Sequence, residues 1–138
     1  MSEESRLRVI AVDDDEAILE TYEAVLSAAY TVKTFSSPAE AKEFLDSAVP
    51  ADIPDVILMD IMMPGISGLV LMTHIRSMPN TAHIPIIAIS GKSDEASVKD
   101  ALLFGAVDFV AKPFDYLTLR AKIKTVFEAS RKPPAGPG

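Results

Sequence analysis

The sequence contains no cysteine, so neither a disulfide framework nor a thiolate metal site is possible. This absence fits the reducing cytoplasm, which is the location that we expect for the protein. Any metal ion that the chain binds must therefore be held by other ligands, such as carboxylate oxygens.

The sequence also lacks a long apolar run and an excess of positive charge. No run approaches the roughly 18–20 residues that a membrane span requires, and the first five residues, MSEES, are too polar and acidic for a secretory signal. We therefore expect no membrane association. The formal net charge of −7 argues against nucleic-acid binding by this domain, so any contact with DNA would need an appended module.

What the chain does contain is enough apolar sequence to fill one core. Its 138 residues suit one compact domain, and 49% of them are hydrophobic. We assign residues 6–130 to this domain. Residues 131–138, RKPPAGPG, are interpreted as a Pro/Gly-rich tail or the stub of a linker.

Five β-like segments alternate with helical patterns, which predicts an α/β domain with a parallel sheet. Segments 7–12, 56–59 and 84–89 are almost continuously apolar, which is typical of interior strands buried on both faces. Segments 30–35 and 107–111 alternate or carry a charge, as edge strands do. The simplest right-handed solution is a doubly wound sheet of order 2-1-3-4-5.

Apolar residues at helical spacing mark the segments between these strands. Ser37-Pro38-Ala39-Glu40 combines a capping box with a proline at the first helical position, and Gly105 is a left-handed stop for the fourth helix. The stripes expected to face the core are Ile18, Tyr22, Val25, Leu26 and Ala29; Ala41, Phe44, Leu45 and Ala48; Leu71, Met72 and Ile75; Val98, Ala101 and Leu102; and Tyr116, Leu119, Ile123, Val126 and Phe127.

Polar residues follow four of the five predicted strands. Asp13 and Asp14 follow the first strand, and Asp60 follows the third. Ser90 follows the fourth strand, and Lys112 the fifth. In an open parallel sheet, ligands bind beyond the carboxyl ends of the strands, where the strand order reverses. We therefore expect these side chains to meet at one rim.

The residue types at this rim predict phosphoryl chemistry that depends on a metal ion. Asp13, Asp14 and Asp60 would repel one another, and a hard divalent cation would relieve that repulsion. Oxygen ligands favour Mg²⁺ over zinc, with Mn²⁺ as an alternative. Lys112 supplies a positive charge and Ser90 a hydroxyl donor for phosphoryl oxygens. Together with a carboxylate nucleophile, these groups make a phosphoryl-transfer site.

Each of these features also has a structural explanation when it is taken alone. The acidic run 14–16 could cap the first helix, residues 90–91 could form an ordinary turn, and Lys112 could be a solvated lysine. Asp60 is harder to explain, because an acid at the end of an apolar strand has no packing role. The convergence of all four positions on one rim favours the chemical interpretation.

Four segments resemble the receiver domain of two-component response regulators: VIAVDDDE at 9–16, DVILMDIMMPGISG at 55–68, IAISG at 87–91 and GAVDFVAKPF at 105–114. Their order and spacing both match the family. The resemblance implies a flavodoxin-like doubly wound (βα)5 sandwich. It also implies a signalling domain that accepts a phosphoryl group and is not otherwise an enzyme.

The resemblance assigns roles to the acidic residues. Asp60 would attack the phosphorus of a histidine-bound phosphoryl group, donated by a sensor histidine kinase or a phosphotransfer protein. Asp14, Asp60 and the backbone carbonyl of Met62 would bind Mg²⁺ directly, and Asp13 would act through a metal-bound water.

The resemblance also implies a switch. Ser90 and Lys112 would each contact a phosphoryl oxygen, and the Lys112–Pro113 peptide bond would be cis. As Ser90 moves inward, Phe109 would rotate into the vacated space and repack the fourth helix, the fifth strand and the fifth helix. That face would then bind a partner, a second copy or an appended output domain. Phe109 could also be an ordinary edge-strand aromatic.

Two residues near the expected site depart from what fast hydrolysis needs. By the resemblance, Met62 and Lys92 would flank the path of the attacking water, and neither is an acid or amide that orients water. We therefore expect slow self-dephosphorylation.

Two other functions are weighed against this one. A Mg²⁺-dependent aspartyl phosphatase of the haloacid-dehalogenase type needs a second acid two residues after its nucleophile, where this chain has Met62. It also needs a cap domain, for which the chain has no room. A pseudo-receiver that no longer takes phosphate would lack Asp60, Asp14 or Lys112, and all three are present.

Overall fold

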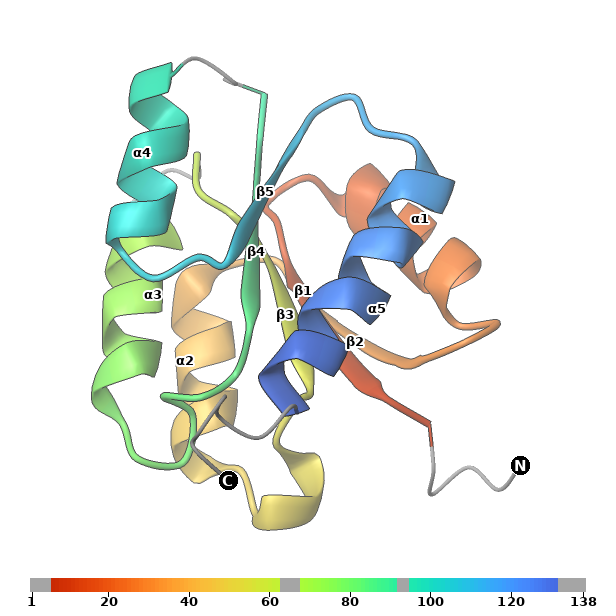
Figure 1. The fold of residues 1–138 in the computed structure, drawn as a ribbon. Helices are drawn as coiled ribbons and strands as arrows, with labels where there is room; N and C mark the ends of the chain where they lie inside the picture. Colours follow the sequence, from red (N-terminus) through yellow and green to blue (C-terminus); the bar gives the residue numbers. More distant parts are fainter. Residues whose placement is uncertain (1–5, 63–67, 92–94, 132–138) are drawn as a thin grey trace, which may run out of the picture.

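The computed structural model describes residues 6–62, 68–91 and 95–131, which form a five-stranded parallel sheet covered by helices on both faces (Figure 1). The sheet has the order β2-β1-β3-β4-β5, which confirms the predicted topology. The strands are β1 (Arg8–Val12), β2 (Thr31–Phe35), β3 (Val56–Asp60), β4 (Ile86–Ser90) and β5 (Asp108–Ala111). Their bounds agree with the predicted segments to within two residues.

The burial of the strands follows the sequence pattern. Every residue of β3 and β4 is buried, and β1 is exposed only in part at its first residue. The edge strands β2 and β5 are more exposed, as predicted. Continuous apolarity therefore separated the interior strands from the edges.

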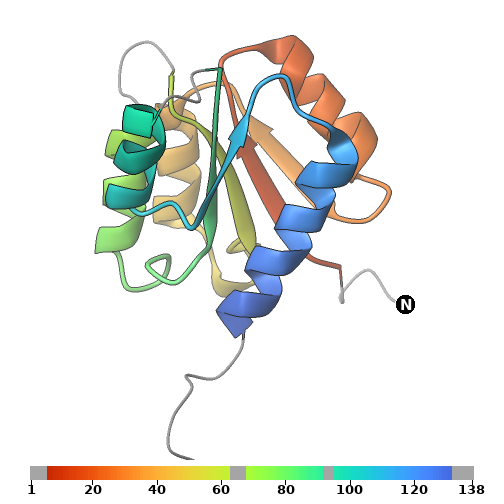
Figure 2. The same cartoon turned by 45° about the horizontal axis from the view of Figure 1, so that its top comes forward.

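The helices form two layers (Figure 2). On one face, α1 (Glu16–Leu26) and α5 (Tyr116–Arg131) cover one group of core residues, which includes Leu19, Ile87 and Ile123. On the other face, α2 (Pro38–Ser47), α3 (Gly68–Ser77) and α4 (Glu95–Leu103) cover a second group. A short 3₁₀ turn, η2 (Pro50–Asp52), joins α2 to β3.

The ends of the helices follow local chemistry. Asp15 caps α1 by accepting from the backbone N–H groups of Ala17 and Ile18, so the capping explanation of the acidic run is correct for this residue. Ser37 accepts from the backbone N–H of Glu40 at the start of α2. Gly105 has a φ of 121°, so it ends α4 as predicted.

Three expectations about the helices were wrong in detail. Helix α1 ends at Leu26, before Ala29, and it buries Leu19, which the predicted stripe left out. Leu102 was expected to face the core, but it is 48% exposed. Ala101 is the one buried residue of α4 among those described. Arg131 continues α5 instead of beginning the tail.

Part of the chain lies outside the described residues. This part holds Lys92, the segment 63–67 and the predicted tail from position 132 onward. Apart from Arg131, which belongs to α5, the assignment of residues 6–130 to the domain and of the following residues to a tail or linker therefore stays a prediction. None of the described helices combines the length and the hydropathy that a bilayer span would need.

Candidate functional site

Parallel pairing brings the carboxyl ends of four strands to one edge of the sheet, at the top of Figure 1. Asp13 comes directly after β1, and Asp60 is the last residue of β3. Ser90 ends β4, where it pairs with Ala111, and Lys112 follows β5. The predicted rim therefore exists, and it holds the residues that the sequence placed there.

Lys112 joins two of the acids at the centre of this rim. Its Nζ lies 2.7 Å from Oδ2 of Asp13 and 3.0 Å from Oδ2 of Asp60. The side chains of Asp13 and Asp60 are 1% and 5% exposed, and that of Lys112 is 21% exposed. Water therefore screens these charges little, and the ammonium group is the neutralising partner of both carboxylates.

The second oxygen of each buried carboxylate is held by the turn that follows its strand. Oδ1 of Asp13 accepts from the backbone N–H of Asp15 at 2.9 Å. Oδ1 of Asp60 accepts from the backbone N–H of Met62 at 2.8 Å. Both carboxylates are thus oriented by backbone groups two residues further along the chain, which fixes them before any ligand arrives.

Burial and charge shift the pKa values of these groups. Burial raises the pKa of Asp13, and the hydrogen bond from Lys112 offsets only part of this effect. Burial by itself lowers the pKa of Lys112, but the hydrogen bonds to Asp13 and Asp60 outweigh it and the net pKa is raised. Lys112 therefore keeps its positive charge, while ionised Asp13 is held at a cost.

A third acid completes a set of oxygen ligands that fits a cation. One carboxylate oxygen from each of Asp13, Asp14 and Asp60 lies within 4.8 Å of the others. Asp13 and Asp60 are buried, whereas Asp14 is exposed. The single ammonium group leaves the three acids with an excess of negative charge, and hard oxygen donors suit Mg²⁺ or Mn²⁺. The residues present therefore fit the predicted ion.

The finer predictions about ligands are not tested by this geometry. Met62 places its backbone N–H on Asp60, and its side chain is 50% exposed. Whether its carbonyl binds the ion, and whether Asp13 acts through water, stay predictions. The Lys112–Pro113 peptide bond is cis, as the resemblance implied.

Ser90 and Phe109, the residues of the predicted switch, lie on the adjacent strands β4 and β5. Ser90 is fully buried at the end of β4, and its backbone carbonyl accepts from the N–H of Lys112 at 2.8 Å. Phe109 pairs with Ala88 and is partly buried against the core on the α3 and α4 side of the sheet. The movement of either residue stays a prediction.

Tyr22 is a neighbour of the site that the sequence analysis treated only as part of a helix stripe. Its ring is buried and stacks on Phe114 with ring centroids 5.8 Å apart. Burial raises the pKa of Tyr22, and the charges of Asp13 and Asp60 raise it further. Its helical spacing gave no sign of this position, because that spacing is equally typical of an ordinary core residue.

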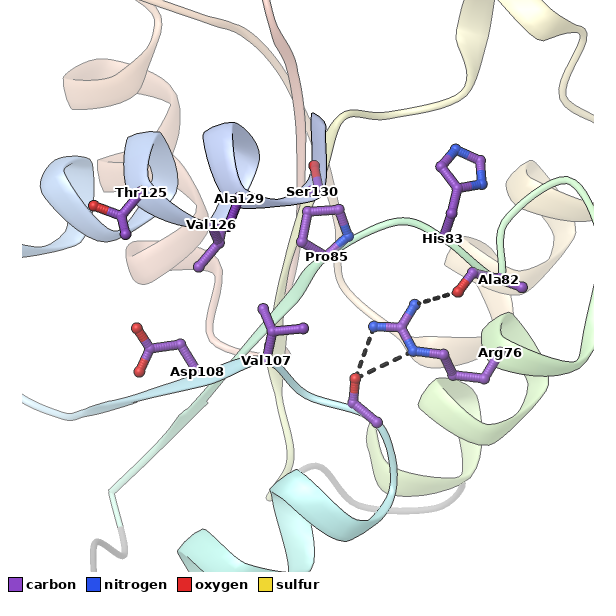
Figure 3. Close-up of a pocket in the computed structure, with 11 residues that line it drawn as sticks. Arg76, Ala82, His83, Pro85, Val107, Asp108, Thr125, Val126, Ala129 and Ser130 are labelled. Carbon is purple, nitrogen blue, oxygen red and sulfur yellow. Dashed lines mark hydrogen bonds between the residues drawn. The ribbon is translucent and has the colours of Figure 1, made fainter. Parts of the chain in front are cut away.

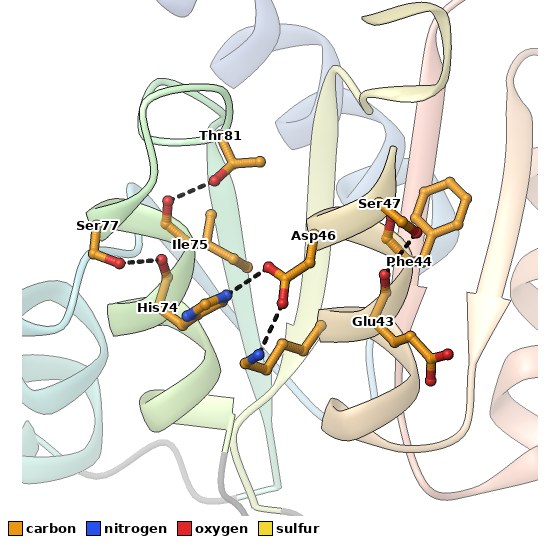
Figure 4. Close-up of polar contacts among 9 residues, drawn as sticks. Glu43, Phe44, Asp46, Ser47, His74, Ile75, Ser77 and Thr81 are labelled. Carbon is orange, nitrogen blue, oxygen red and sulfur yellow. Dashed lines mark hydrogen bonds and ion pairs between the residues drawn. The ribbon is translucent and has the colours of Figure 1, made fainter. Parts of the chain in front are cut away.

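The polar contacts between α2 and α3 lie apart from the acidic rim (Figure 4). Nε2 of His74 lies 2.8 Å from one Asp46 oxygen, and Nζ of Lys42 lies 2.8 Å from the other. These hydrogen bonds lower the pKa of Asp46, and the bond from Lys42 contributes more than the bond to His74. We interpret this group as a surface link between two helices.

Comparison with known proteins agrees with this architecture. Residues 9–124 match the family model of the response regulator receiver domain. The chain is 34% identical over 119 residues to the response regulator PleD of Caulobacter vibrioides, covering 86% of this chain and 26% of that protein. It is 36% identical over 118 residues to the transcriptional regulatory protein FixJ of Azorhizobium caulinodans, covering 86% of this chain and 54% of that protein.

Solved structures match over almost their whole length. A putative response regulator from Chloroflexus aurantiacus superposes with a TM-score of 0.80 at 29% identity, covering 90% of this chain and 99% of that one. The chemotaxis protein CheY4 of Vibrio cholerae gives 0.81 at 26% identity, covering 88% and 99%.

Fold and rim together define a flavodoxin-like α/β signalling domain whose acidic residues could hold a metal ion. The chain belongs to the response regulator receiver domain family. It spans only about a quarter to a half of the length of the curated relatives compared above.

Proposed function

We propose that this receiver domain accepts a phosphoryl group on Asp60 from a phosphohistidine of a sensor histidine kinase or a phosphotransfer protein. The observation that carries the proposal is the position of Lys112, whose Nζ contacts both Asp13 and Asp60 beside the exposed Asp14. The proposed nucleophile, the ammonium group and the proposed acidic ligands thus share one rim, and an arrangement of this kind is what in-line phosphoryl transfer requires.

In the proposed reaction a carboxylate oxygen of Asp60 attacks the phosphorus atom of the donor. The new O–P bond forms as the P–N bond breaks, the electrons of the P–N bond go to the imidazole nitrogen of the donor, and that nitrogen takes a proton from solvent. The backbone N–H of Met62 orients the Asp60 carboxylate through its other oxygen. Lys112 then exchanges a carboxylate contact for a contact to a phosphoryl oxygen, which neutralises part of the transferred charge.

Asp14, Asp60 and the Met62 carbonyl would hold Mg²⁺ or Mn²⁺ directly in this proposal, and Asp13 would act through a metal-bound water. When bound, the ion supplies positive charge that offsets the negative charge of the phosphoryl oxygens. The buried Ser90 hydroxyl would donate to another of these oxygens, since Ser90 ends the strand beside β3.

Phosphorylation would then change the surface formed by α4, β5 and α5. The inward movement of Ser90 and the rotation of Phe109 would shift the population between two packings of this face. A partner, a second copy of the chain or an appended output domain would bind the phosphorylated form. We propose that this takes place in the cytoplasm and that the domain itself contacts neither a membrane nor nucleic acid.

The competing functions have less support. Asp13, Asp14, Asp60 and Lys112 are together in the structure, which a phosphate-independent pseudo-receiver would not require. A half-exposed Met62 occupies the place where an aspartyl phosphatase needs its second acid. Apart from its own phosphorylation and slow dephosphorylation, we propose no catalytic activity for the domain.

The proposal is tested by incubating the protein with acetyl phosphate and Mg²⁺, followed by intact mass spectrometry. We expect the unmodified protein to gain the mass of one phosphoryl group. No such mass should be added when EDTA replaces Mg²⁺, or when Asp60 is replaced by asparagine. Asp52→Asn is the matched control, because Asp52 is an exposed carboxylate on η2. No added mass in the unmodified protein, or full labelling of Asp60→Asn, would overturn the proposal.

A further inference from the structure

Arg76 connects two loops that precede β4 and β5 and therefore lie at the edge of the sheet opposite the acidic rim. Figure 3 shows this arginine and its contacts with Ala82 and the turn after α4. Arg76 lies in the last turn of α3, and its Nε and Nη2 donate to the carbonyl of Gly105 at 3.2 and 2.7 Å. Its Nη1 donates to the carbonyl of Ala82 at 3.0 Å and to that of Ile84 at 2.6 Å. One side chain thus connects α3, the loop before β4 and the turn after α4.

Gly105 is fitted closely to this arginine. With its φ of 121°, a Cβ at this position would lie 2.9 Å from Cγ and 3.1 Å from Nε of Arg76. The turn therefore approaches the arginine closely, and a side chain there would push the two apart.

The positive charge of Arg76 is also stabilised by its position beside the end of α4. Burial lowers the pKa of the guanidinium, but an arginine stays protonated in proteins. The carbonyl of Gly105 follows the carboxyl end of α4, where the helix dipole is negative and a cation is favourable. The contact therefore anchors this end of α4 by charge as well as by hydrogen bonds.

The rest of α4 is held weakly by comparison. Ala101 is its fully buried residue among those described, while Leu102 and Leu103 are 48% and 80% exposed. A pocket of about 580 Å³ lies between this turn and α5, and its lining includes Arg76, Gly105 and Val126, so α5 does not fill this space (Figure 3). Backbone hydrogen bonds also hold the turn, among them that from the N–H of Val107 to the carbonyl of Ile86 at 2.8 Å, and Arg76 adds the side-chain contact that ties the turn to α3.

We infer that Arg76 is a positioning residue for the switch, which fixes the turn at Gly105 as the pivot about which α4 moves. A helix anchored at one end and weakly packed along its length moves most at its free end. The free end of α4, at Glu95, follows the segment that leads from Ser90, where the phosphoryl group is proposed to act. The inference rests on the proposed function, because it concerns movement that phosphorylation causes.

The test compares amide chemical shifts in ¹H–¹⁵N NMR spectra before and after adding beryllofluoride and Mg²⁺. Beryllofluoride takes the place of a phosphoryl group on the acceptor carboxylate. In the unmodified chain we expect large shifts at Ile61, next to the acceptor, and at Val98 and Lys99, but small shifts at Gly105 and Ala106. Contiguity alone does not establish coupling, so this response to activation is the deciding measurement.

Two substitutions separate the pivot from simple loss of stability. Arg76→Met removes all four hydrogen bonds, and Arg76→Lys keeps the charge while lacking the fork that reaches several carbonyls. In both we expect the response at Ile61 to be unchanged and the activation shifts of Gly105 and Ala106 to rise at least threefold. Arg120→Met, at an exposed position on α5, is the matched control and should behave as the unmodified chain.

The outcomes distinguish this inference from the proposed function. Suppose that Ile61 responds, and that the activation shifts of Gly105 and Ala106 are the same with and without Arg76. The inference that Arg76 fixes a pivot is then wrong, while the proposal that Asp60 accepts a phosphoryl group is unaffected. If Ile61 does not respond in the unmodified chain, both are wrong. Should Arg76→Met fail to fold, Arg76→Lys decides between the same outcomes.

Discussion

The ammonium group of Lys112 lies 3.0 Å from Oδ2 of Asp60, although 52 residues separate them in the chain. The same ammonium lies 2.7 Å from Oδ2 of Asp13, a residue 99 positions away. The parallel sheet creates these contacts, because it brings the ends of β1, β3 and β5 to one edge.

Replacing Lys112 by methionine should destabilise the metal-free protein. The substitution leaves the carboxylates of Asp13 and Asp60 buried without their cation, which costs about 1–3 kcal/mol of unfolding free energy. Urea unfolding in EDTA at neutral pH measures this loss. Adding Mg²⁺ should stabilise Lys112→Met more than the unmodified chain, because the ion replaces part of the missing positive charge.

Lys124→Met is the control for this experiment, since Lys124 is exposed on α5. It should change the free energy of unfolding by less than about 0.5 kcal/mol, with or without Mg²⁺. Equal stability of Lys112→Met and Lys124→Met in EDTA would contradict the view that Lys112 neutralises the buried acids.

Asp13→Asn should alter how stability depends on pH in metal-free buffer. Burial raises the pKa of Asp13 in the folded protein above its value in the unfolded chain. Its ionised form therefore costs stability at neutral pH, and this cost disappears as the pH falls through the folded pKa. Asparagine carries no such charge, so Asp13→Asn should be the more stable protein at pH 7, with an advantage that shrinks on acidification.

Thermal unfolding measured at a series of pH values checks this prediction. The series runs from neutral pH down to about pH 4, which is close to the ordinary pKa of a carboxyl group. The exposed Asp52→Asn is the control, and its difference from the unmodified chain should not follow the same trend. An advantage of Asp13→Asn that grows as the pH falls would mean that the pKa of Asp13 is lowered in the folded protein.

The fold could be predicted from the sequence because its strands carry an unambiguous signal. The strands β3 and β4 are apolar at nearly every position and buried on both faces, so their place inside the sheet follows from composition. The helix faces were less certain. Leu102 fits a helical stripe by its spacing, yet it is 48% exposed, because the docking angle of α4 decides which side faces the core.

The site could be predicted as far as the ends of strands determine it. Asp60 and Lys112 were assigned to one rim because parallel strands share their direction, and the structure places them in contact. The contacts of Arg76 could not be predicted in this way. Its partners are the backbone carbonyls of Ala82, Ile84 and Gly105, and a carbonyl is present at every residue whatever its side chain.

Gly68→Ala should destabilise the protein, even though alanine favours helices more than glycine does by about 1 kcal/mol. A Cβ on Gly68 would clash with the backbone carbonyl oxygen of Asp60 and would lie 2.9 Å from Cα of Ile61. The start of α3 would have to move away from the end of β3, at a net cost of about 1–3 kcal/mol.

Gly91→Ala gives a matched comparison, because a Cβ there would meet no atom within 4 Å. Urea unfolding should therefore show a loss of stability for Gly68→Ala and little change for Gly91→Ala. If Gly68→Ala loses as little stability as Gly91→Ala, α3 can shift away from Asp60 without cost.

Met62→Asn should shorten the lifetime of the phosphorylated form. The Met62 side chain is 50% exposed, and its backbone N–H already holds Oδ1 of Asp60, so the residue stands beside the acceptor carboxylate. A thioether cannot orient water, whereas an amide both donates and accepts hydrogen bonds. We expect the asparagine to position the attacking water and to raise the rate of phosphoryl loss about tenfold, which is less than the roughly 10²-fold or more that general acid–base catalysis contributes, because an amide orients water without taking its proton. Intact mass measured over time after removal of acetyl phosphate gives this rate.

Val70→Asn introduces the same amide at another exposed apolar residue, on α3, and should leave the lifetime unchanged. If the two variants lose the phosphoryl group at the same rate as the unmodified chain, the side chain at position 62 does not control the attacking water and another residue limits the hydrolysis of the acyl phosphate.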